Sequence, residues 1–244
     1  MEFRLFGEVH VVGGGIRVHP SSGRARTLLA ALAWEPGELV PDERLIGRIW
    51  GERLPADPRD ALYTCVKRLR RALAVLGGGA DRVVRRHGGY LLAAEHADTD
   101  VSRFRTLVRQ AREETDATVA AYLYERAIRT ASGTPLVDAD SSWASRVGEA
   151  LERERLAART AAAEAWLRAG RHEELLPELI HLTREQPLDE AVALLLMDAL
   201  HRSGRGAEAL DCYTSLRRRL VDQLGVEPGR AVRQAHQRLL GARS

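Results

Sequence analysis

The residues best placed to do chemistry in this 244-residue chain are clustered cations, and the chemistry they support is the binding of phosphate. The segment from Asp60 to Leu76 reads DALYTCVKRLRRALAVL. Leucine and valine recur in it at spacings of three and four, which predicts a helix with one apolar side. The opposite side carries a hydroxyl and three cations: Thr64, Lys67, Arg68 and Arg71. Such a helix buries one face in a core and offers the other to a negatively charged partner.

A second basic motif follows this helix, RVVRRHGGYLL over residues 82–92. Two short apolar runs around Gly88 and Gly89 predict a β-hairpin. Arg86 and His87 fall at its tip, and Arg85 lies one position earlier on the strand. A basic helix followed by a basic hairpin indicates a surface that holds nucleic acid.

The distribution of charge supports this interpretation better than the total does. The chain carries 37 basic and 34 acidic residues, a net charge of +3. Residues 1–95 hold 15 basic and 11 acidic residues, which leaves 22 and 23 for the rest. Residues 57–86 alone hold 8 basic and 3 acidic residues. A concentrated positive patch is typical of phosphate contact, although a solvated helix face is the simpler explanation of a charge run.

The sequence lacks the residues that an enzyme, a metalloprotein or a membrane protein would need. We find no nucleophile–base pair and no Walker lysine, so we expect no enzyme and no cofactor. Cys65 and Cys212 lie far apart, and we expect Cys65 to be a small core residue. No short metal-ligand spacing joins the histidines of the second half, His172, His181, His201 and His236, so no metal site is expected. No apolar run approaches 18 residues, and we expect a cytoplasmic protein with reduced thiols and no membrane contact.

The elements that must position the cations form a recognisable order. FRLF and VHVVGGGIRVHP predict short strands that turn at residues 13–15. Helices are expected over about residues 24–34 and 41–50, with Pro41 in the first turn of the second. Asp57 or Asp60 then caps the basic helix. Strands, two helices, a basic helix and a hairpin make up a winged helix-turn-helix of the OmpR/PhoB type, the DNA-binding domain of many phosphorelay regulators. In this fold the third helix enters the major groove and the wing approaches the backbone or the minor groove.

Beyond about residue 99 the pattern becomes helical throughout. Predicted helices cover residues 100–112, 117–130, 143–169, 172–185, 188–202, 206–224 and 229–240. AWLRAGRHEELL and DALHRSGRGAEAL align with an offset of 34 residues, the tetratricopeptide period. Asp138, Asp140 and Ser141 are interpreted as the cap of the helix at Trp143 rather than as a cation site. The predicted fold is therefore mainly α with a small β component: a winged helix over residues 1–95 and an all-α helical-repeat domain over residues 98–244.

The two halves together resemble the SARP family, the Streptomyces antibiotic regulatory proteins. The N-terminal likeness rests on FRLFGEVHV, RTLLAALAWEPGELVPDERLIGRIWG, VKRLRRAL and HGGYLL. The C-terminal likeness rests on EQPLDEAVALLLMDALHRSGRGAEALDCYTSLRRRLVDQLGVEPG. The resemblance covers roughly residues 3–240 and implies a small stand-alone member, with an OmpR-like domain joined to a bacterial transcriptional activation domain. Lys67 departs from the family pattern, which often has a small polar residue there, so base preference is expected to differ.

Physical reasoning assigns roles to the cations. Thr64, Lys67 and Arg68 are expected to contact bases or lie near them, and the resemblance supports Arg68 most. Arg71 is expected to contact phosphate or a flanking base. Arg70 points sideways from this face, which leaves open a phosphate contact or a pair with an acidic neighbour. In the wing, Arg86 and His87 are better candidates than Arg85, which could simply decorate a strand.

The resemblance implies an activator of a secondary-metabolite gene cluster. Its members bind direct repeats near the promoter −35 region as a homodimer or as side-by-side protomers, and recruit RNA polymerase holoenzyme through its sigma factor and other subunits. The alternative is a helical-repeat adaptor for proteins that binds DNA only weakly. The basic helix argues against that alternative.

Overall fold

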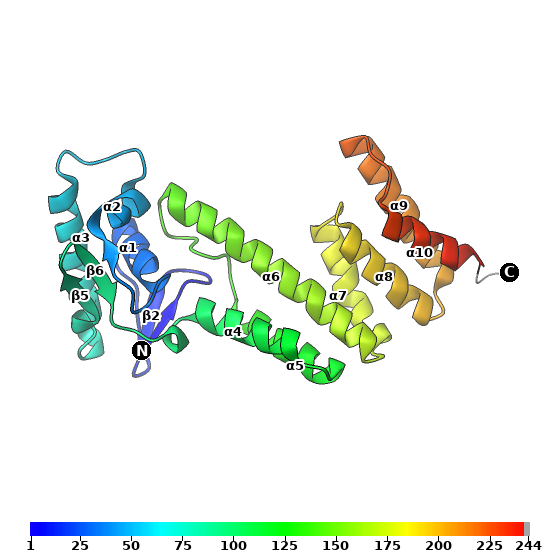
Figure 1. Ribbon diagram of the computed structural model, residues 1–244, viewed down its shortest axis with the longest axis horizontal. Coiled ribbons are helices and arrows are strands. Elements are labelled where there is room, and N and C mark those ends of the chain that lie inside the picture. The colour runs from blue at the N-terminus through cyan, green and yellow to red at the C-terminus, as the bar shows by residue number, and fades with distance from the viewer. Residues whose placement is uncertain (242–244) are drawn as a thin grey trace. The chain divides into compact units, whose positions relative to one another are not determined.

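The computed structural model describes residues 1–241, with only the backbone described at Ala97, and the chain forms two compact units (Figure 1). The first unit contains residues 1–110 and 125–158, and the second contains residues 111–124 and the chain from residue 159 onward. Three helices contribute residues to both units: α4 (Asp100–Glu113), α5 (Ala117–Thr130) and α6 (Ser142–Arg168). The sequence predicted two consecutive domains that divide at residues 95–98. The two units are each built from separate segments of the chain and do not test that division, which stays a prediction.

The first unit begins with an antiparallel sheet of three strands, β1 (Glu2–Arg4), β2 (His10–Gly13) and β3 (Ile16–Val18). Phe3 pairs with Val11, and Val11 pairs with Val18, so one face of the sheet carries three buried side chains. Gly14 and Gly15 adopt positive φ angles of 55° and 80° between β2 and β3. The triple glycine is therefore the turn of a hairpin, as predicted.

Three helices form the core beside this sheet: α1 (Gly23–Ala33), α2 (Asp42–Trp50) and α3 (Pro58–Leu73). Each packs against the other two. The Ser22 hydroxyl caps α1 by accepting the Ala25 N–H at 3.1 Å. Leu28, Leu45 and Leu69, one from each helix, are fully buried. These contacts fix the direction of α3, whose outer side carries the cations predicted to bind DNA.

A second sheet has the strand order β4–β6–β5, with β4 at Val40–Pro41, β5 at Val83–Arg86 and β6 at Gly89–Leu92. The β5–β6 hairpin is as predicted, whereas β4 was not expected. The prediction that Pro41 lies in the first turn of α2 is wrong. Pro41 is extended and pairs with Gly89, and the first helical residue, Asp42, donates its N–H to the Gly88 carbonyl at 2.9 Å. A proline suits this edge strand because it has no N–H to leave unpaired.

The basic helix also ends earlier than predicted. The α-helix stops at Leu73, and residues 74–76 form a 3₁₀ turn, one of three with bounds Ala74–Leu76, Ala80–Arg82 and His96–Asp98. Gly79 explains the tight bend that follows, because a Cβ there would lie 2.3 Å from the Leu73 carbonyl oxygen. Leu76 is consequently half-buried and lies beyond the α-helical part of the apolar stripe.

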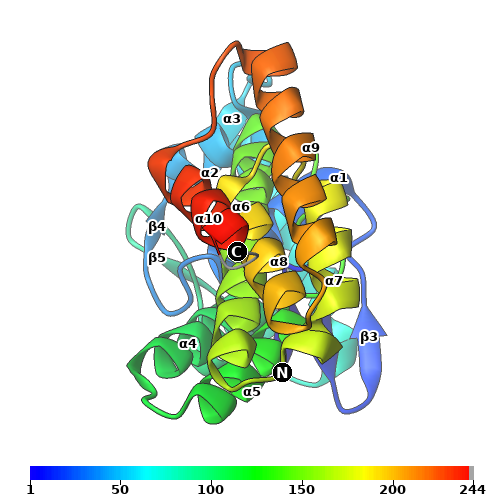
Figure 2. The same ribbon diagram turned by 90° about the vertical axis from the view of Figure 1, so that its right-hand side faces the viewer.

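All seven predicted helices of the C-terminal part are confirmed. The helices not yet introduced are α7 (His172–Glu185), α8 (Glu190–Arg202), α9 (Gly206–Leu224) and α10 (Arg230–Gly241). In the second unit α8 packs against α7, α9 and α10, and Figure 2 shows α7, α8 and α9 side by side. The first residue of α8 is Glu190 instead of Leu188, because the Asp189 carboxylate accepts the N–H groups of Ala191 and Val192.

The 34-residue repeat has a structural counterpart in the second unit. Gly170 and Gly204 both adopt positive φ angles, 82° and 73°, at helix ends. The next residues, Arg171 and Arg205, each donate their N–H to the carbonyl five residues back, at 3.0 and 2.8 Å. Each of these arginines also pairs with the glutamate three residues on. The sequence repeat therefore marks a repeated helix–turn–helix unit.

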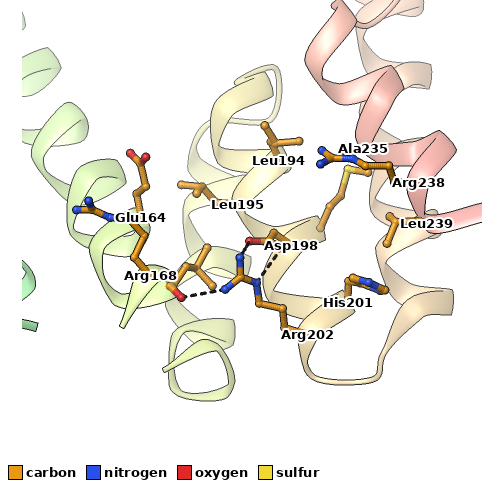
Figure 3. A pocket seen from close by; sticks show the side chains of 12 residues that line it. Glu164, Arg168, Leu194, Leu195, Asp198, His201, Arg202, Ala235, Arg238 and Leu239 are labelled. Carbon is orange, nitrogen blue, oxygen red and sulfur yellow. Dashed lines mark hydrogen bonds and ion pairs between the residues drawn. The ribbon is translucent and has the colours of Figure 1, made fainter. Parts of the chain in front are cut away.

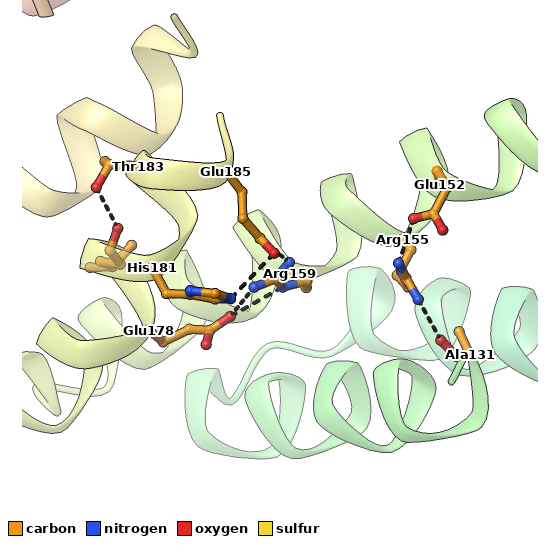
Figure 4. Close-up of polar contacts among 9 residues, drawn as sticks. Ala131, Glu152, Arg155, Arg159, Glu178, His181, Thr183 and Glu185 are labelled. Atoms are coloured by element: carbon orange, nitrogen blue, oxygen red, sulfur yellow. Dashed lines mark hydrogen bonds and ion pairs between the residues drawn. The ribbon is translucent and has the colours of Figure 1, made fainter. Parts of the chain in front are cut away.

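Arg159 joins α6 to α7 within the second unit (Figure 4). Its guanidinium binds Glu178 at 2.8 Å and Glu185 at 2.6 Å, and His181 lies 3.2 Å from Glu185. A few residues earlier on α6, Arg155 donates to the carbonyls of Ala131 and Gly133 in the first unit.

A hollow of about 470 Å³ opens in the second unit between α6, α8 and α10 (Figure 3). Leu194 and Leu195 of α8 line it, with Arg168 of α6 and Arg238 of α10 at its sides. Arg202 also lines it, and donates to Asp198 and to the Leu167 carbonyl, both at 3.1 Å.

Asp100 is a charged group buried in the core of the first unit. Its carboxylate accepts the N–H groups of Leu5 at 3.0 Å, Phe6 at 2.9 Å and Val101 at 2.8 Å. It therefore connects the segment after β1 to the start of α4. Burial raises the pKa of Asp100 to about 6, although the backbone N–H bonds from Phe6 and Leu5 oppose that rise.

We predict that Asp100→Asn lowers the free energy of unfolding by about 1–3 kcal/mol at pH 7. The asparagine amide offers one acceptor oxygen, so at least one backbone N–H is left without a partner. Chemical denaturation measures the loss, with Asp81→Asn as the control because Asp81 is exposed in the same unit. Equal stabilities of the two variants would contradict the role of Asp100 as a buried acceptor.

We also predict how this effect depends on pH. The folded pKa of Asp100, about 6, lies above its ordinary value of 3.8, so the folded chain binds this proton more tightly. The contribution of that proton to stability is fully present below about pH 4 and is lost as the pH rises through 6. Between pH 5 and 7 the wild type should lose about 1 kcal/mol relative to Asp100→Asn, which has no such proton to release. A difference that stays constant over this range would show that the pKa is not raised.

Candidate nucleic-acid interface

Helix α3 is positioned by its cap and by its apolar stripe. The Asp57 carboxylate accepts the N–H groups of Arg59 at 3.1 Å and Asp60 at 3.0 Å, and Pro58 occupies the first turn. This settles the predicted choice of cap in favour of Asp57. The side chains of the stripe are buried: Leu62, Cys65, Val66, Leu69 and Leu73.

The outer side of α3 forms what we call the basic face, defined by Thr64, Lys67, Arg68 and Arg71. Lys67, Arg68 and Arg71 are exposed and Thr64 is half-buried. Within residues 1–241, none of the three cations forms an ion pair or a side-chain hydrogen bond. Their charges are therefore available to a ligand.

Tyr63 also belongs to this exposed side, although it was not among the predicted site residues. Its side chain is 60% exposed, although most large aromatic side chains are buried. The signal was its spacing, since Tyr63 lies four residues before Lys67 and therefore on the same side of the helix.

Arg70 is turned away from the basic face towards the wing. Its Nε and Nη2 atoms donate to the Val83 carbonyl oxygen at 3.0 and 2.6 Å. Of the two roles left open for Arg70, the structure shows neither an acidic partner nor a free guanidinium. The side chain instead holds the first residue of β5 against α3, and so sets the position of the wing.

The two arginines of the wing have different surroundings. Arg85 makes a two-pronged ion pair with Asp42 at 2.5 and 2.9 Å and stacks over the Tyr90 ring at 4.5 Å. The hydrogen bond to Asp42 raises the pKa of Arg85 further. Arg86 and His87 are exposed at the tip, and neither has a side-chain partner among the described residues.

Two glycines and a tyrosine shape the hairpin. Gly88 adopts a φ angle of 77° at the turn. A Cβ at Gly89 would lie 2.3 Å from the Val40 carbonyl oxygen, so only glycine lets β4 approach this closely. Tyr90 is 4% exposed and packs the wing against the body, as predicted.

Comparison with known proteins identifies this arrangement. Residues 18–92 match the family described as "Transcriptional regulatory protein, C terminal", and residues 99–240 match "Bacterial transcriptional activator domain". The regulatory protein DnrI of Streptomyces peucetius is 34% identical over 99% of this chain and 93% of its own length. The chain belongs to the SARP family of transcriptional regulators.

Further relatives support the same assignment. This SARP is 35% identical to the transcriptional regulator RedD of Streptomyces coelicolor, over 98% of this chain and 70% of RedD. A solved structure of Mycobacterium tuberculosis EmbR in complex with a low affinity phosphopeptide superimposes with a TM-score of 0.92 at 28% identity. The match covers 99% of this chain and 65% of that one. The predicted fold class is confirmed, and the family is one of transcription factors rather than of enzymes.

Cys65 of this SARP is a core residue, and Cys212 is half-buried. Cys65 is 5% exposed, as predicted, and burial raises the pKa of its thiol although Arg68 and Arg24 oppose that rise. Burial also raises the pKa of Cys212, to about 11. Both groups are therefore neutral thiols at pH 7, the less reactive form.

Residues 1–241 lack a membrane-spanning helix and a cluster of metal-ligating side chains. No helix there is both long and apolar enough to span a bilayer. No three side chains of histidine, cysteine, aspartate or glutamate gather in that part of the chain as metal ligands would.

We predict that Arg68→Ala weakens binding to a preferred duplex by about 1–3 kcal/mol and relaxes its sequence preference. The duplex is first selected from a random-sequence library with the wild-type chain, and fluorescence anisotropy then measures both affinities. Arg218→Ala is the control, because Arg218 is exposed on α9. Unchanged affinity for the selected duplex would remove Arg68 from the residues that read sequence.

We predict that Arg86→Ala weakens binding to all duplexes and reduces the slope of log K against log salt by about 1. Arg17→Ala is the control, and it should leave the slope unchanged because Arg17 is exposed on β3, outside the basic face and the wing. The same slope for wild type and Arg86→Ala would contradict a phosphate contact at the wing tip.

Arg70→Ala should act through stability. Loss of the two bonds to the Val83 carbonyl should lower the free energy of unfolding by about 1–2 kcal/mol. Thermal denaturation measures the loss. If instead the variant keeps its stability and loses salt-dependent affinity, Arg70 contacts phosphate.

Proposed function

We propose that this SARP activates transcription of a secondary-metabolite gene cluster. It binds direct repeats near the promoter −35 region through the basic face of α3 and the wing. It then recruits RNA polymerase holoenzyme, including its sigma factor, through the helical repeats. The relatives DnrI and RedD are both regulators of full-chain similarity, which supports this class of role.

One observation carries the DNA-binding half of the proposal. Lys67, Arg68 and Arg71 have no protein partner within residues 1–241, on a helix whose other side is buried in the core. A buried ion pair with an acidic side chain would have neutralised these charges. Because they have no such partner, they favour the binding of a polyanion. Lys67 and Arg68 are proposed to reach base edges, with Thr64 beside them, and Arg71 to contact phosphate or a flanking base.

The wing completes the proposed interface. Arg86 and His87 are proposed to contact the DNA backbone or the adjacent minor groove. Arg70 and Arg85 were included as candidate DNA contacts, and their bonds to Val83 and Asp42 make a positioning role the better proposal for both.

Direct repeats require more than one copy of the chain on DNA. We propose that protomers bind side by side, or as a homodimer, because a single basic face covers only one repeat. As a transcription factor the protein would act in the cytoplasm, at the nucleoid.

Footprinting and transcription test the proposal together. We expect the full chain to protect two or more direct repeats upstream of an operon near its own gene at about 150 mM salt. Addition of the protein to purified RNA polymerase holoenzyme should then increase the run-off transcript from that promoter. Arg68→Ala should reduce both effects at a protein concentration that saturates the wild-type site, and Arg218→Ala neither.

The same experiment separates activation from the adaptor alternative. An adaptor would bind the polymerase or another protein without protecting DNA, and its activity would not depend on Arg68. Protection without a transcript would overturn activation and leave only DNA binding.

A further inference from the structure

A hollow of about 550 Å³ lies in the first unit, between the start of α1, the end of α2 and the start of α6. None of the residues of the basic face lines it. It therefore presents a separate set of side chains, and these share one property: most of them can donate hydrogen bonds to an anion.

Three arginines supply positive charge to the hollow. Arg24, Arg53 and Arg146 line it and are exposed, and none of them forms an ion pair in the part of the chain that the structure describes. Arginines nearby behave differently, since Arg26 pairs with Asp138 at 2.8 Å and Arg48 with Glu35 at 2.8 Å. The three guanidiniums of the hollow thus keep their full donor capacity.

Trp50 supplies a buried donor without an acceptor. Trp50 lines the hollow and is only 7% exposed, and its indole N–H has no partner among residues 1–241. Arg24 lies over its ring at 5.6 Å. Buried donors are nearly always satisfied by protein, water or ligand, and an acceptor from outside the chain would satisfy this N–H.

The start of α6 adds backbone donors. The Ser141 hydroxyl accepts the Ala144 N–H at 3.1 Å, which leaves the N–H groups of Ser142 and Trp143 without an intrahelical acceptor. α6 is 27 residues long, and the N-terminus of a helix attracts anions.

Two carboxylates limit which anion fits. Glu52 and Asp140 also line the hollow, so the side-chain charge there is +1 and not +3. Neither carboxylate pairs with the three arginines. A singly charged carboxylate ligand gains little in this field, whereas a phosphate group brings about −1.5 to −2 at pH 7 and three acceptor oxygens.

We propose that this hollow binds a phosphate group, held by Arg24, Arg146 and the N-terminus of α6, with Trp50 donating its indole N–H. The phosphate belongs either to a diffusible phosphorylated compound or to the DNA backbone. The chemistry of recognition is the same for both, and the proposal does not depend on the basic face.

The indole N–H of Trp50 is a direct reporter of occupancy. The chain has four tryptophans, so a ¹H–¹⁵N correlation spectrum contains four indole signals, and Trp50→Phe assigns one of them. Titration of the wild-type chain with inorganic pyrophosphate, at constant ionic strength set with sodium chloride, should shift that signal to saturation. Arg24→Ala and Arg146→Ala should each weaken the binding about 5-fold or more.

Controls separate this site from general charge effects. Arg17→Ala removes an exposed arginine of β3 in the same unit and should bind pyrophosphate as the wild type does. Arg68→Ala should also respond normally, which distinguishes failure of this proposal from failure of the DNA-binding proposal. Circular dichroism checks that each variant is folded.

Three outcomes decide whether the hollow binds phosphate and where that phosphate comes from. A saturable shift with pyrophosphate in the absence of DNA assigns the site to a diffusible phosphorylated compound. A shift with the selected duplex, and none with pyrophosphate, assigns it to the DNA backbone. The proposal is overturned if neither ligand moves the Trp50 signal, or if Arg24→Ala and Arg146→Ala bind as tightly as the wild type.

Discussion

Burial of one side of α3 is the constraint on which the rest of this protein depends. Leu62, Val66, Leu69 and Leu73 are buried, α3 packs against α1 and α2, and the hydrophobic effect keeps these side chains in the core. Because the helix has a fixed period, this packing decides which residues face outwards. The residues that face outwards include Lys67, Arg68 and Arg71, so the outer side of α3 is basic. The position of the β4–β6–β5 sheet also depends on α3, because Arg70 of that helix binds the carbonyl of Val83 in β5.

Arginine serves two purposes in the first unit, and local partners separate them. Arg70 and Arg85 are held by Val83 and Asp42, and they position the wing. Arg68 and its neighbours have no such partner and remain free for a polyanion. A chain that relies on one residue type for both scaffold and ligand contact needs this division, because a guanidinium bound by the protein has fewer donors left for phosphate. The residues around each arginine, and not the sequence motif, therefore decide which arginines are free to bind a ligand.

The C-terminal helices illustrate how local signals accumulate into a reliable prediction. Gly170 and Gly204 end their helices in the same way, and an arginine–glutamate pair follows each of them. These are short-range interactions, so the sequence reveals them directly. Asp100 is the opposite case. Two of the N–H donors to its carboxylate, Leu5 and Phe6, lie more than 90 positions away in the chain, and nothing in the local sequence indicates that the carboxylate is buried.

By itself the sequence determined the helices, the wing hairpin, the repeat and the family, because each depends on spacing, turn residues or caps within a few positions. It also determined the basic face, through the apolar period of α3. Only the tertiary structure decided that β4 completes the wing sheet, that Pro41 is extended, and that Arg70 and Arg85 are held by the protein. It alone assembled Arg24, Trp50 and the start of α6 around one hollow. The reason is physical, because such contacts join segments that are distant in sequence. An arginine in the sequence does not reveal whether its guanidinium binds a carboxylate, a carbonyl or DNA.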